Sequence, residues 1–198
     1  MARLDFWYEF ASTYSYVSAM RLETLAKAAG VELRWRPFLL GPIFVEQGWN
    51  NSPFNIYPVK GRYMWRDMER ICEKSGLPLV RPQAFPQNSI TAARAALALS
   101  DADRPAFSRA IYEAEFAKGR LISERVVVAA ILSGLGHDAE SVLTKAGTDE
   151  IKTALKVQTE EAKKLGIFGA PAFVCPSGEL FWGNDRLEDA LLWAKTRG

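Results

Sequence analysis

The clearest chemistry in the chain comes from two hydroxyl side chains three residues apart, Ser12 and Ser15, between a strand-like segment and a helical one. A helix N-terminus favours a bound anion, because free backbone N–H groups and the helix dipole point toward it. A serine hydroxyl there can donate a hydrogen bond to a thiolate brought by another molecule, whereas two serines cannot form the disulfide of a Cys-x-x-Cys pair. The alternative role for Ser12 is that of a simple helix N-cap.

Two further motifs offer polar or backbone groups. Pro171 follows Ala170 just before a second strand-like run. A proline at this place either leaves the preceding backbone free to pair with a peptide ligand or simply opens a strand. Asn184 and Asp185 begin the last helix, where Asp185 could accept hydrogen bonds from an α-ammonium group and free N–H groups could hold a carboxylate. In isolation, capping is the ordinary role of such residues.

A group of cations begins at Lys60. The helix that follows interleaves both signs of charge, which is typical of a solvated and partly paired surface; its charged residues include Arg62, Arg66, Asp67, Glu69 and Arg70. Lys60 differs from them because it lies at the end of a loop.

Residue counts exclude several kinds of site. The chain has one histidine, His137, and two cysteines, Cys72 and Cys175. These are too few for a zinc site or a metalloprotease helix, so we predict no metal. His137 lies in a glycine-rich turn and is interpreted as a solvated loop or cap residue, and the cysteines as buried or inert thiols. No glycine-rich phosphate loop follows a strand.

The composition is typical of a soluble globular protein. Of 198 residues, 48% are hydrophobic and 24% charged, with a formal net charge of +2. A near-neutral chain is a poor nucleic-acid partner, and no apolar run approaches the ~20 residues of a membrane span. Since the first residues show no export signal, we expect a cytoplasmic protein.

The candidate residues need elements that bring both ends of the chain together. Residues 3–10 alternate like a strand, residues 14–29 have helical spacing that stops at Gly30, and residues 31–36 alternate again. This pattern predicts two parallel strands joined by a right-handed helical crossover. Strand patterns return near the C-terminus and predict an antiparallel hairpin and a final helix, at 172–175, 179–182 and about 185–196.

The middle of the chain is predicted to be helical. Residues 38–57 are rich in Gly, Pro and Asn, and predict a loop with at most short helical turns. Helices are expected at 61–75, 88–100, 104–118, 124–133, 141–145 and 149–165.

This order of elements predicts an α/β protein with a thioredoxin-like fold, βαβ…ββα with a mixed sheet, and a long all-helical insertion. We expect a discontinuous thioredoxin-like domain, residues 1–38 plus 166–198, and a helical insertion subdomain, residues 39–165. In such a layout the Ala170–Pro171 bond is expected to be cis and to lie across a cleft from Ser12.

Four motifs, in this order, resemble the 2-hydroxychromene-2-carboxylate isomerases, which belong to the DsbA-like thioredoxin superfamily and are related to kappa-class glutathione transferases. The resemblance runs end to end. The motifs are DFWYEFASTYSY at 5–16, PVKGRYM at 58–64, FGAPAF at 168–173 and FWGNDRL at 181–187. The family more often has proline where Thr13 stands and threonine where Ala172 stands, but neither change removes a donor assigned to glutathione.

The resemblance implies that Ser12 is the catalytic hydroxyl, which holds the thiolate of glutathione. It further implies that Ala170 and Pro171 clamp the backbone of the cysteinyl unit and that Asn184 and Asp185 hold the γ-glutamyl end.

The resemblance also implies two cofactor-binding residues from the insertion, Asn51 near the thiol and Lys60 near the glycyl carboxylate, with Asn55 as an alternative to Asn51. Aromatic residues could line a flat substrate pocket or could equally pack in the core: Trp7, Tyr14, Trp49, Phe54 and Tyr57.

The implied function is a glutathione-dependent isomerase of aromatic hydrocarbon catabolism. It would interconvert 2-hydroxychromene-2-carboxylate and trans-o-hydroxybenzylidenepyruvate by thiolate addition, bond rotation and elimination. The alternatives are a kappa-type glutathione transferase or peroxidase and a non-catalytic thioredoxin-like binding module. The implied partners are glutathione, a small aromatic substrate and, by resemblance, a second copy of the chain in a homodimer.

Overall fold

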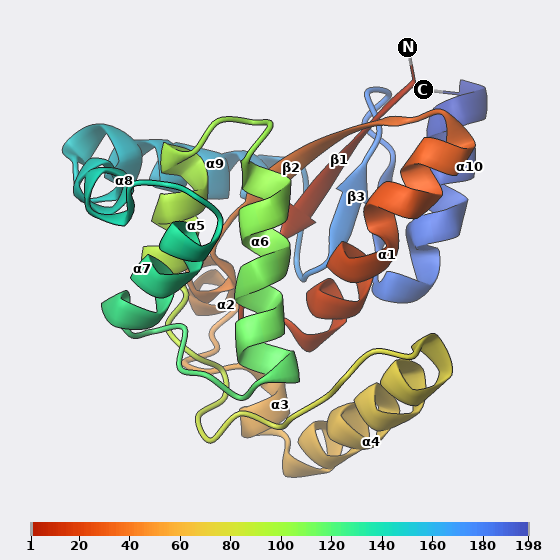
Figure 1. Ribbon diagram of the computed structural model, residues 1–198. Helices are drawn as coiled ribbons and strands as arrows, with labels where there is room; N and C mark the ends of the chain where they lie inside the picture. The colour runs from red at the N-terminus through yellow and green to blue at the C-terminus, as the bar shows by residue number, and fades with distance from the viewer. Residues whose placement is uncertain (1, 198) are drawn as a thin grey trace.

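In the computed structural model, which describes residues 2–197, four strands form one mixed sheet with the order β2-β1-β3-β4 (Figure 1). β1 (Arg3–Tyr8) pairs in parallel with β2 (Glu32–Pro37) and antiparallel with β3 (Ala172–Val174), and β3 pairs antiparallel with β4 (Leu180–Trp182). The predicted parallel pairing of the first two strands and the predicted antiparallel hairpin near the C-terminus are confirmed. The first and last segments of the chain are therefore neighbours in one sheet.

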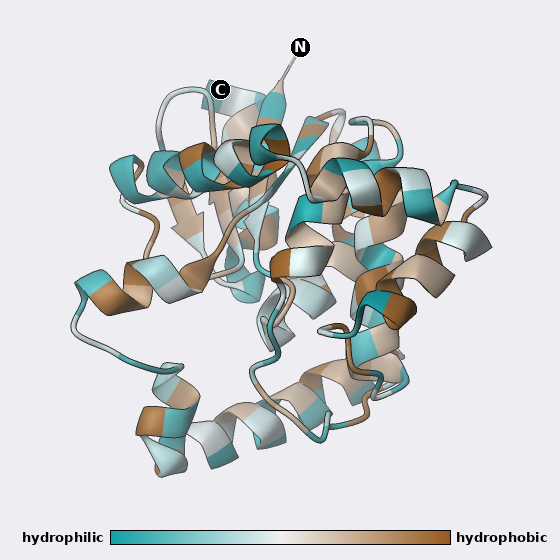
Figure 2. Ribbon diagram, turned by 90° about the vertical axis from the view of Figure 1, so that its left-hand side faces the viewer, coloured by the Kyte–Doolittle hydropathy of each residue, from teal (hydrophilic) through white to brown (hydrophobic). Residues whose placement is uncertain are grey.

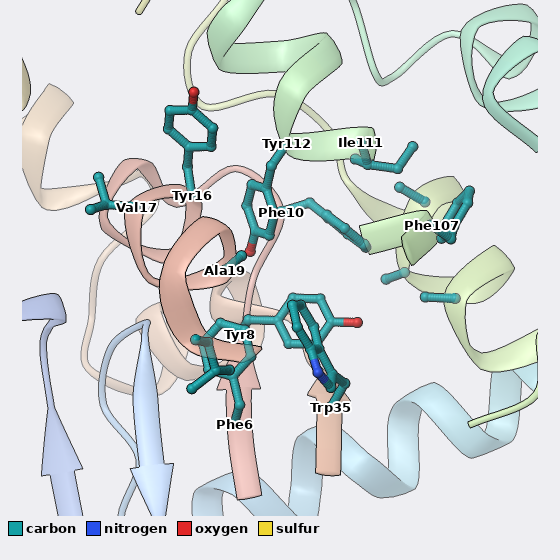
Figure 3. Packing of buried hydrophobic residues seen from close by; sticks show 14 of the residues in the cluster. Phe6, Tyr8, Phe10, Tyr16, Val17, Ala19, Trp35, Phe107, Ile111 and Tyr112 are labelled. Atoms are coloured by element: carbon teal, nitrogen blue, oxygen red, sulfur yellow. The ribbon is translucent and has the colours of Figure 1, made fainter. Parts of the chain in front are cut away.

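Both faces of β1 are covered, as its alternating side chains require. Leu4, Phe6 and Tyr8 enter the large core cluster, and Figure 3 shows Phe6 and Tyr8 packed beside Trp35 of β2. Trp7 points to the opposite face and joins a smaller cluster with Phe38. β1 ends at Tyr8 rather than at residue 10, since the next residues turn to enter the first helix.

The crossover helix α1 (Thr13–Ala29) begins and ends as its sequence predicts. Ser12 is its N-cap, and its side chain accepts a hydrogen bond from the backbone N–H of Ser15. Gly30 ends it with φ 70°, the left-handed conformation that glycine adopts readily. The short 3-10 helix η2 (Asn184–Arg186) leads into α10 (Leu187–Arg197), which packs alongside α1 (Figure 1).

Residues between β2 and β3 form the all-helical insertion, since no strand occurs there among the described residues. Its helices are α2 (Leu40–Glu46), α3 (Pro53–Ile56), α4 (Pro58–Ser75), α5 (Ile90–Ala98), α6 (Arg104–Tyr112), the π-helical turn η1 (Glu113–Ala117), α7 (Arg125–Gly134), α8 (Ala139–Ala146) and α9 (Asp149–Lys164). The segment 38–57 thus contains a seven-residue helix, α2, more than the short turns expected. The helix expected at 104–118 changes to π-helical geometry after Tyr112.

The insertion packs through amphipathic helices, along which hydrophobic and hydrophilic residues alternate in Figure 2. One large hydrophobic cluster contains residues of the sheet, α1 and α10 together with residues of α4 to α9. The division into a domain of residues 1–38 plus 166–198 and a subdomain of residues 39–165 stays a prediction. Within residues 2–197, no helix is long and apolar enough to cross a membrane.

Candidate active site

A cavity of about 1450 Å³ lies where the carboxyl end of β1, the start of α1, the turn before β3 and the start of η2 meet the insertion. α3 and α4 lie below these elements in Figure 1. Six of the seven residues predicted for the site line this cavity: Ser12, Asn51, Lys60, Ala170, Asn184 and Asp185. The seventh, Pro171, is the neighbour of Ala170 and lies in the turn that forms this part of the wall.

Ser12, near the N-terminus, hydrogen-bonds Ala170, in the C-terminal part of the chain, at the cavity wall. Its Oγ accepts from the Ser15 backbone N–H at 3.2 Å and donates to the Ala170 carbonyl oxygen at 3.0 Å. The hydroxyl is therefore both a helix cap and a donor, because its lone pairs serve the helix while its proton points to a separate acceptor. Rotation about the Cβ–Oγ bond can redirect that proton to a ligand. Ser15 itself is fully buried and does not line the cavity.

The turn before β3 carries the expected cis Ala170–Pro171 bond, with Ala170 across from Ser12. The carbonyl of Pro171 accepts from the backbone N–H of Gly183 at 3.0 Å, which fixes the turn to the start of η2. Gly183 has φ 107°, and a Cβ there would lie 2.6 Å from Oδ1 of Asp185. Only glycine suits this position.

Asn184 and Asp185 follow that glycine in different environments. Asn184 is buried, and its Oδ1 accepts from the Ser18 hydroxyl of α1 at 3.0 Å, which orients the amide. Asp185 is exposed, and its one ion-pair contact within residues 2–197 is with Arg186, at 3.7 Å. Its carboxylate is therefore accessible to a ligand ammonium group.

The insertion contributes Asn51 and Lys60. Asn51 Oδ1 accepts from the Ser52 backbone N–H at 2.7 Å and from Asn55 Nδ2 at 3.2 Å. Asn55 does not line the cavity; it lines a smaller hollow bordered by α3 and α4 and also donates to the Phe85 carbonyl. Lys60 is exposed at the first turn of α4, and among the described residues it has no ion-pair partner, only a 4.8 Å contact with the Tyr57 ring.

Three of the five aromatic residues expected at the pocket line the cavity: Tyr14, Trp49 and Phe54. Trp7 is instead fully buried in the smaller core cluster, and Tyr57 is not part of the lining. The Tyr14 hydroxyl donates to Asp67 of α4 at 2.9 Å, which ties α1 to α4 at the cavity edge, and burial raises the pKa of Tyr14.

One cavity residue has no counterpart among the sequence predictions. Glu9 follows β1 and is buried, and the alternation of residues 3–10 only placed it on the face opposite Phe10. Burial raises the pKa of its carboxyl to about 7, although hydrogen bonds from Ser89 and the Ala11 backbone oppose the shift. A lone acidic residue next to a strand gives no sequence signal for burial.

The two cysteines and the histidine, for which the sequence predicted no role in the site, do not line the cavity. Cys72 and Cys175 are free and buried, and burial raises the pKa of each thiol to about 11, so both are protonated at neutral pH. His137 lies after α7, in the turn that precedes α8. Among residues 2–197, no cluster of three or more His, Cys, Asp and Glu side chains could hold a metal ion.

Comparison with known proteins gives consistent matches over almost the whole chain. The family model for the DSBA-like thioredoxin domain matches residues 3–191. The chain is 30% identical over 190 residues to a 2-hydroxychromene-2-carboxylate isomerase of Sphingobium xenophagum, covering 93% of this chain and 94% of that protein. It is 27% identical over 200 residues to the glutathione S-transferase kappa 1 of Homo sapiens, covering 93% and 87%. A solved 2-hydroxychromene-2-carboxylate isomerase structure superposes with a TM-score of 0.84 at 27% identity, covering 93% of this chain and 90% of that one.

Proposed function

The chain belongs to the DsbA-like thioredoxin family, in the group of 2-hydroxychromene-2-carboxylate isomerases and kappa-class glutathione transferases, and we propose that it is a glutathione-dependent isomerase. Its proposed reaction interconverts 2-hydroxychromene-2-carboxylate and trans-o-hydroxybenzylidenepyruvate. One observation carries the proposal: Ser12 Oγ lies at the N-terminus of α1, 3.0 Å from the Ala170 carbonyl, in a cavity that also holds Lys60 and Asp185.

The groups around the cavity fit the three parts of glutathione. Ser12 Oγ and the α1 N-terminus offer a donor and a positive dipole to a thiolate, and the backbone of Ala170 beside Pro171 can pair with the cysteinyl unit. Asp185 is free to accept from the γ-glutamyl ammonium, with Asn184 beside it. Lys60 has no ion-pair partner among the described residues and can attract the glycyl carboxylate, and Asn51 lines the same cavity.

When bound, glutathione would supply a nucleophilic thiolate that adds to the conjugated substrate, permits rotation about the resulting single bond and is eliminated again. Ser12 would favour that thiolate by donating its proton to the sulfur in place of the Ala170 oxygen, since a thiol normally ionises well above neutral pH. Apolar side chains would exclude water around a flat substrate; they include Leu39, Phe44, Trp49, Phe54 and Phe85.

A kappa-type glutathione transferase or peroxidase is the second candidate, and the charges in the cavity favour it. The only cations in the described lining are Lys60 and Arg186, and Arg186 already contacts Asp185 and Asp189 at 3.7 and 3.6 Å. With glutathione bound, a substrate carboxylate would therefore depend on amide groups such as those of Gln87 and Asn88, whereas a neutral electrophile needs no cation.

Analysis of the reaction products separates the isomerase from the glutathione transferase. The protein is mixed with glutathione and either the chromene or a chloronitrobenzene, and absorbance spectra identify the products. Conversion of the chromene without consumption of glutathione supports the isomerase, and a thioether product supports the transferase. If neither substrate reacts although calorimetry detects glutathione binding, a non-catalytic thioredoxin-like binding module is the better description. Homodimer formation remains a prediction from the family resemblance, and a cytoplasmic location remains a prediction from the sequence alone.

A further inference from the structure

Glu9 is a carboxyl group built into the cavity by the same turn that presents Ser12. The backbone N–H of Ser12 donates to the Glu9 carbonyl at 3.0 Å, so the two residues close one turn between β1 and α1. The Tyr112 hydroxyl donates to the same carbonyl at 3.0 Å and anchors it to α6. Glu9 is only 7% exposed, yet it lines the cavity.

The carboxylate itself is held from two sides. Ser89, which also lines the cavity, hydrogen-bonds Glu9 Oε1, and the Ala11 backbone N–H donates to the carboxyl group. These contacts hold the group beside the segment of residues 85–90, all of which line the same cavity. Glu9 and Ser89 are therefore a hydrogen-bonded pair in the wall of the space that would hold both glutathione and the second substrate.

The surroundings of Glu9 keep a proton on it near neutrality. Among the described residues, the titratable groups that interact with Glu9 are Glu115 of η1 and Tyr112 of α6, and no arginine, lysine or histidine contributes to the shift of its pKa. Glu115 is fully buried, and neither of its carboxyl oxygens has a hydrogen-bond partner. Burial first, and then the charge of Glu9, raise the pKa of Glu115 well above its ordinary value.

We propose that Glu9 is a catalytic acid–base residue of this cavity. The proposal rests on the proposed glutathione site and on its α,β-unsaturated carbonyl substrate, and deepens it by naming the group that handles the substrate's proton.

The proton and electron balance is simple. As the C–S bond forms at the β-carbon, the π-electron pair of the C=C bond shifts toward the carbonyl, and its oxygen gains electron density. The Glu9 carboxyl transfers its proton to that oxygen and becomes a carboxylate. In the reverse direction Glu9 removes the same proton, the electrons return to the C=C bond and the C–S bond breaks. No oxidant or net proton is needed, so the group is regenerated in each turnover.

Displacement chemistry does not need this group. When a thiolate displaces chloride from a chloronitrobenzene, the leaving group departs as an anion and no proton moves to the aromatic substrate. The two substrate types therefore distinguish Glu9 as an acid–base residue from Glu9 as a structural residue, which would affect both reactions.

The test compares Glu9→Gln, Glu9→Asp and the control Glu115→Gln at several pH values. Glu9→Gln keeps the shape of a protonated carboxyl but cannot exchange a proton. We expect it to lower kcat for an enone substrate about 10²- to 10⁴-fold and to remove the limb of the pH profile near pH 7. Chloronitrobenzene turnover and calorimetric glutathione affinity should stay within about twofold. Glu9→Asp should restore part of the enone activity, and Glu115→Gln, which changes a buried carboxyl that does not line the cavity, should keep the limb near pH 7.

A measurement without glutathione supports the same assignment. Infrared difference spectra of the free protein should show a protonated carboxyl band that disappears as pH rises through about 7 and that is absent in Glu9→Gln. Retention of enone activity and of the pH limb by Glu9→Gln would overturn the proposal, as would an equal loss of both reactions. Failure of the wild-type protein to bind glutathione would instead overturn the proposed function on which it rests.

Discussion

The Ser12 hydroxyl illustrates how one atom can serve both folding and chemistry. Its oxygen accepts the Ser15 N–H that would otherwise be free at the start of α1, while its proton points across the cavity wall to Ala170. Capping and thiolate binding are therefore compatible, because they use different parts of the same hydroxyl. Substitution of the residue separates the two roles, because each loss has its own measurable consequence.

Ser12→Ala is expected to lose both functions with different magnitudes. Loss of the cap should lower the free energy of unfolding by about 1 kcal/mol. Loss of the donor should raise the pKa of bound glutathione, measured by thiolate absorbance near ~240 nm, and lower turnover about 10- to 1000-fold.

Ser15→Ala is the matched control, because Ser15 caps nothing with its hydroxyl and does not line the cavity, while its backbone N–H remains. It should keep the thiolate absorbance of the wild-type protein. If Ser12→Ala also keeps wild-type turnover and thiolate fraction, Ser12 is only a cap.

Glu9 predicts a pH dependence of stability in the free protein. Its folded-state pKa of about 7 lies above the ordinary value of 4.5, so the folded state binds more protons than the unfolded state between these pH values. Stability should therefore fall as pH rises from about 4.5 to 7, by roughly 3 kcal/mol for this group. Urea unfolding of the wild type and Glu9→Gln at several pH values measures the difference. A slope as steep in Glu9→Gln would assign the effect to another group, such as Glu115.

Six of the residues proposed from the sequence line the cavity, but the sequence did not point to Glu9. Ser12, Ala170 and Asn184 stand in motifs with a recognisable order, and the sheet brings them together. Glu9 is buried because the irregular segment 85–90 packs over it, with Ser89 hydrogen-bonded to its carboxyl. Packing of an irregular segment leaves no periodic signal in the sequence.

At the element scale, strongly patterned segments were predicted well and irregular ones were not. β1, α1 and β2 follow the expected alternation and helical spacing, with boundaries within one or two residues. α2 was missed because Gly41, Pro42 and Gly48 resemble a loop, whereas contacts with α9 support a helix there. The π-helical turn after Tyr112 likewise carries no propensity signal, since it continues a regular helical pattern.

The close approach of α3 and α4 gives an element-scale prediction. A Cβ at Gly61 would lie 2.3 Å from the backbone carbonyl oxygen of Phe54, so any larger residue must separate the two helices. Gly61→Ala should destabilise the protein by about 1–3 kcal/mol and weaken glutathione binding, since it displaces the adjacent Lys60. Thermal unfolding and calorimetry measure the two effects.

Gly134→Ala is the matched helical control, because its Cβ would meet nothing within 4 Å at the end of α7. It should be neutral or stabilising by up to about 1 kcal/mol. A melting temperature and glutathione affinity unchanged in Gly61→Ala would show that α3 can shift freely and that its contact with α4 does not position Lys60.

At the scale of the whole molecule, the cavity connects segments that are distant in sequence. Its wall combines the end of β1, the turn before β3 and the start of η2 with the start of α4 from the insertion. A ligand that contacts all of these must stabilise both parts of the proposed discontinuous arrangement together. Measuring how a ligand stabilises each part therefore tests the domain organisation and the ligand site together.

Glutathione is expected to raise the melting temperature, because a ligand that binds only the native state stabilises it by RT ln(1 + [L]/Kd), about 2.7 kcal/mol at 100 times Kd. Hydrogen exchange should slow both in residues 166–186 and at the start of α4, where local opening is suppressed by the ligand. Protection confined to one of these segments would show that the insertion and the sheet do not share the ligand.

Fragments of glutathione assign its two ends to opposite sides of the cavity. Lys60→Ala should reduce the thermal shift caused by glutathione but leave that of γ-glutamylcysteine unchanged, because the dipeptide lacks the glycyl carboxylate that Lys60 would attract. Asp185→Asn should reduce the shift with glutathione but not with cysteinylglycine, which lacks the γ-glutamyl ammonium. Each variant is thus the control for the other, since either substitution alone leaves the opposite end of the cavity intact. If both variants weaken both dipeptides equally, the residues act through folding of the cavity rather than through contact with the ligand, and the proposed orientation of glutathione is wrong.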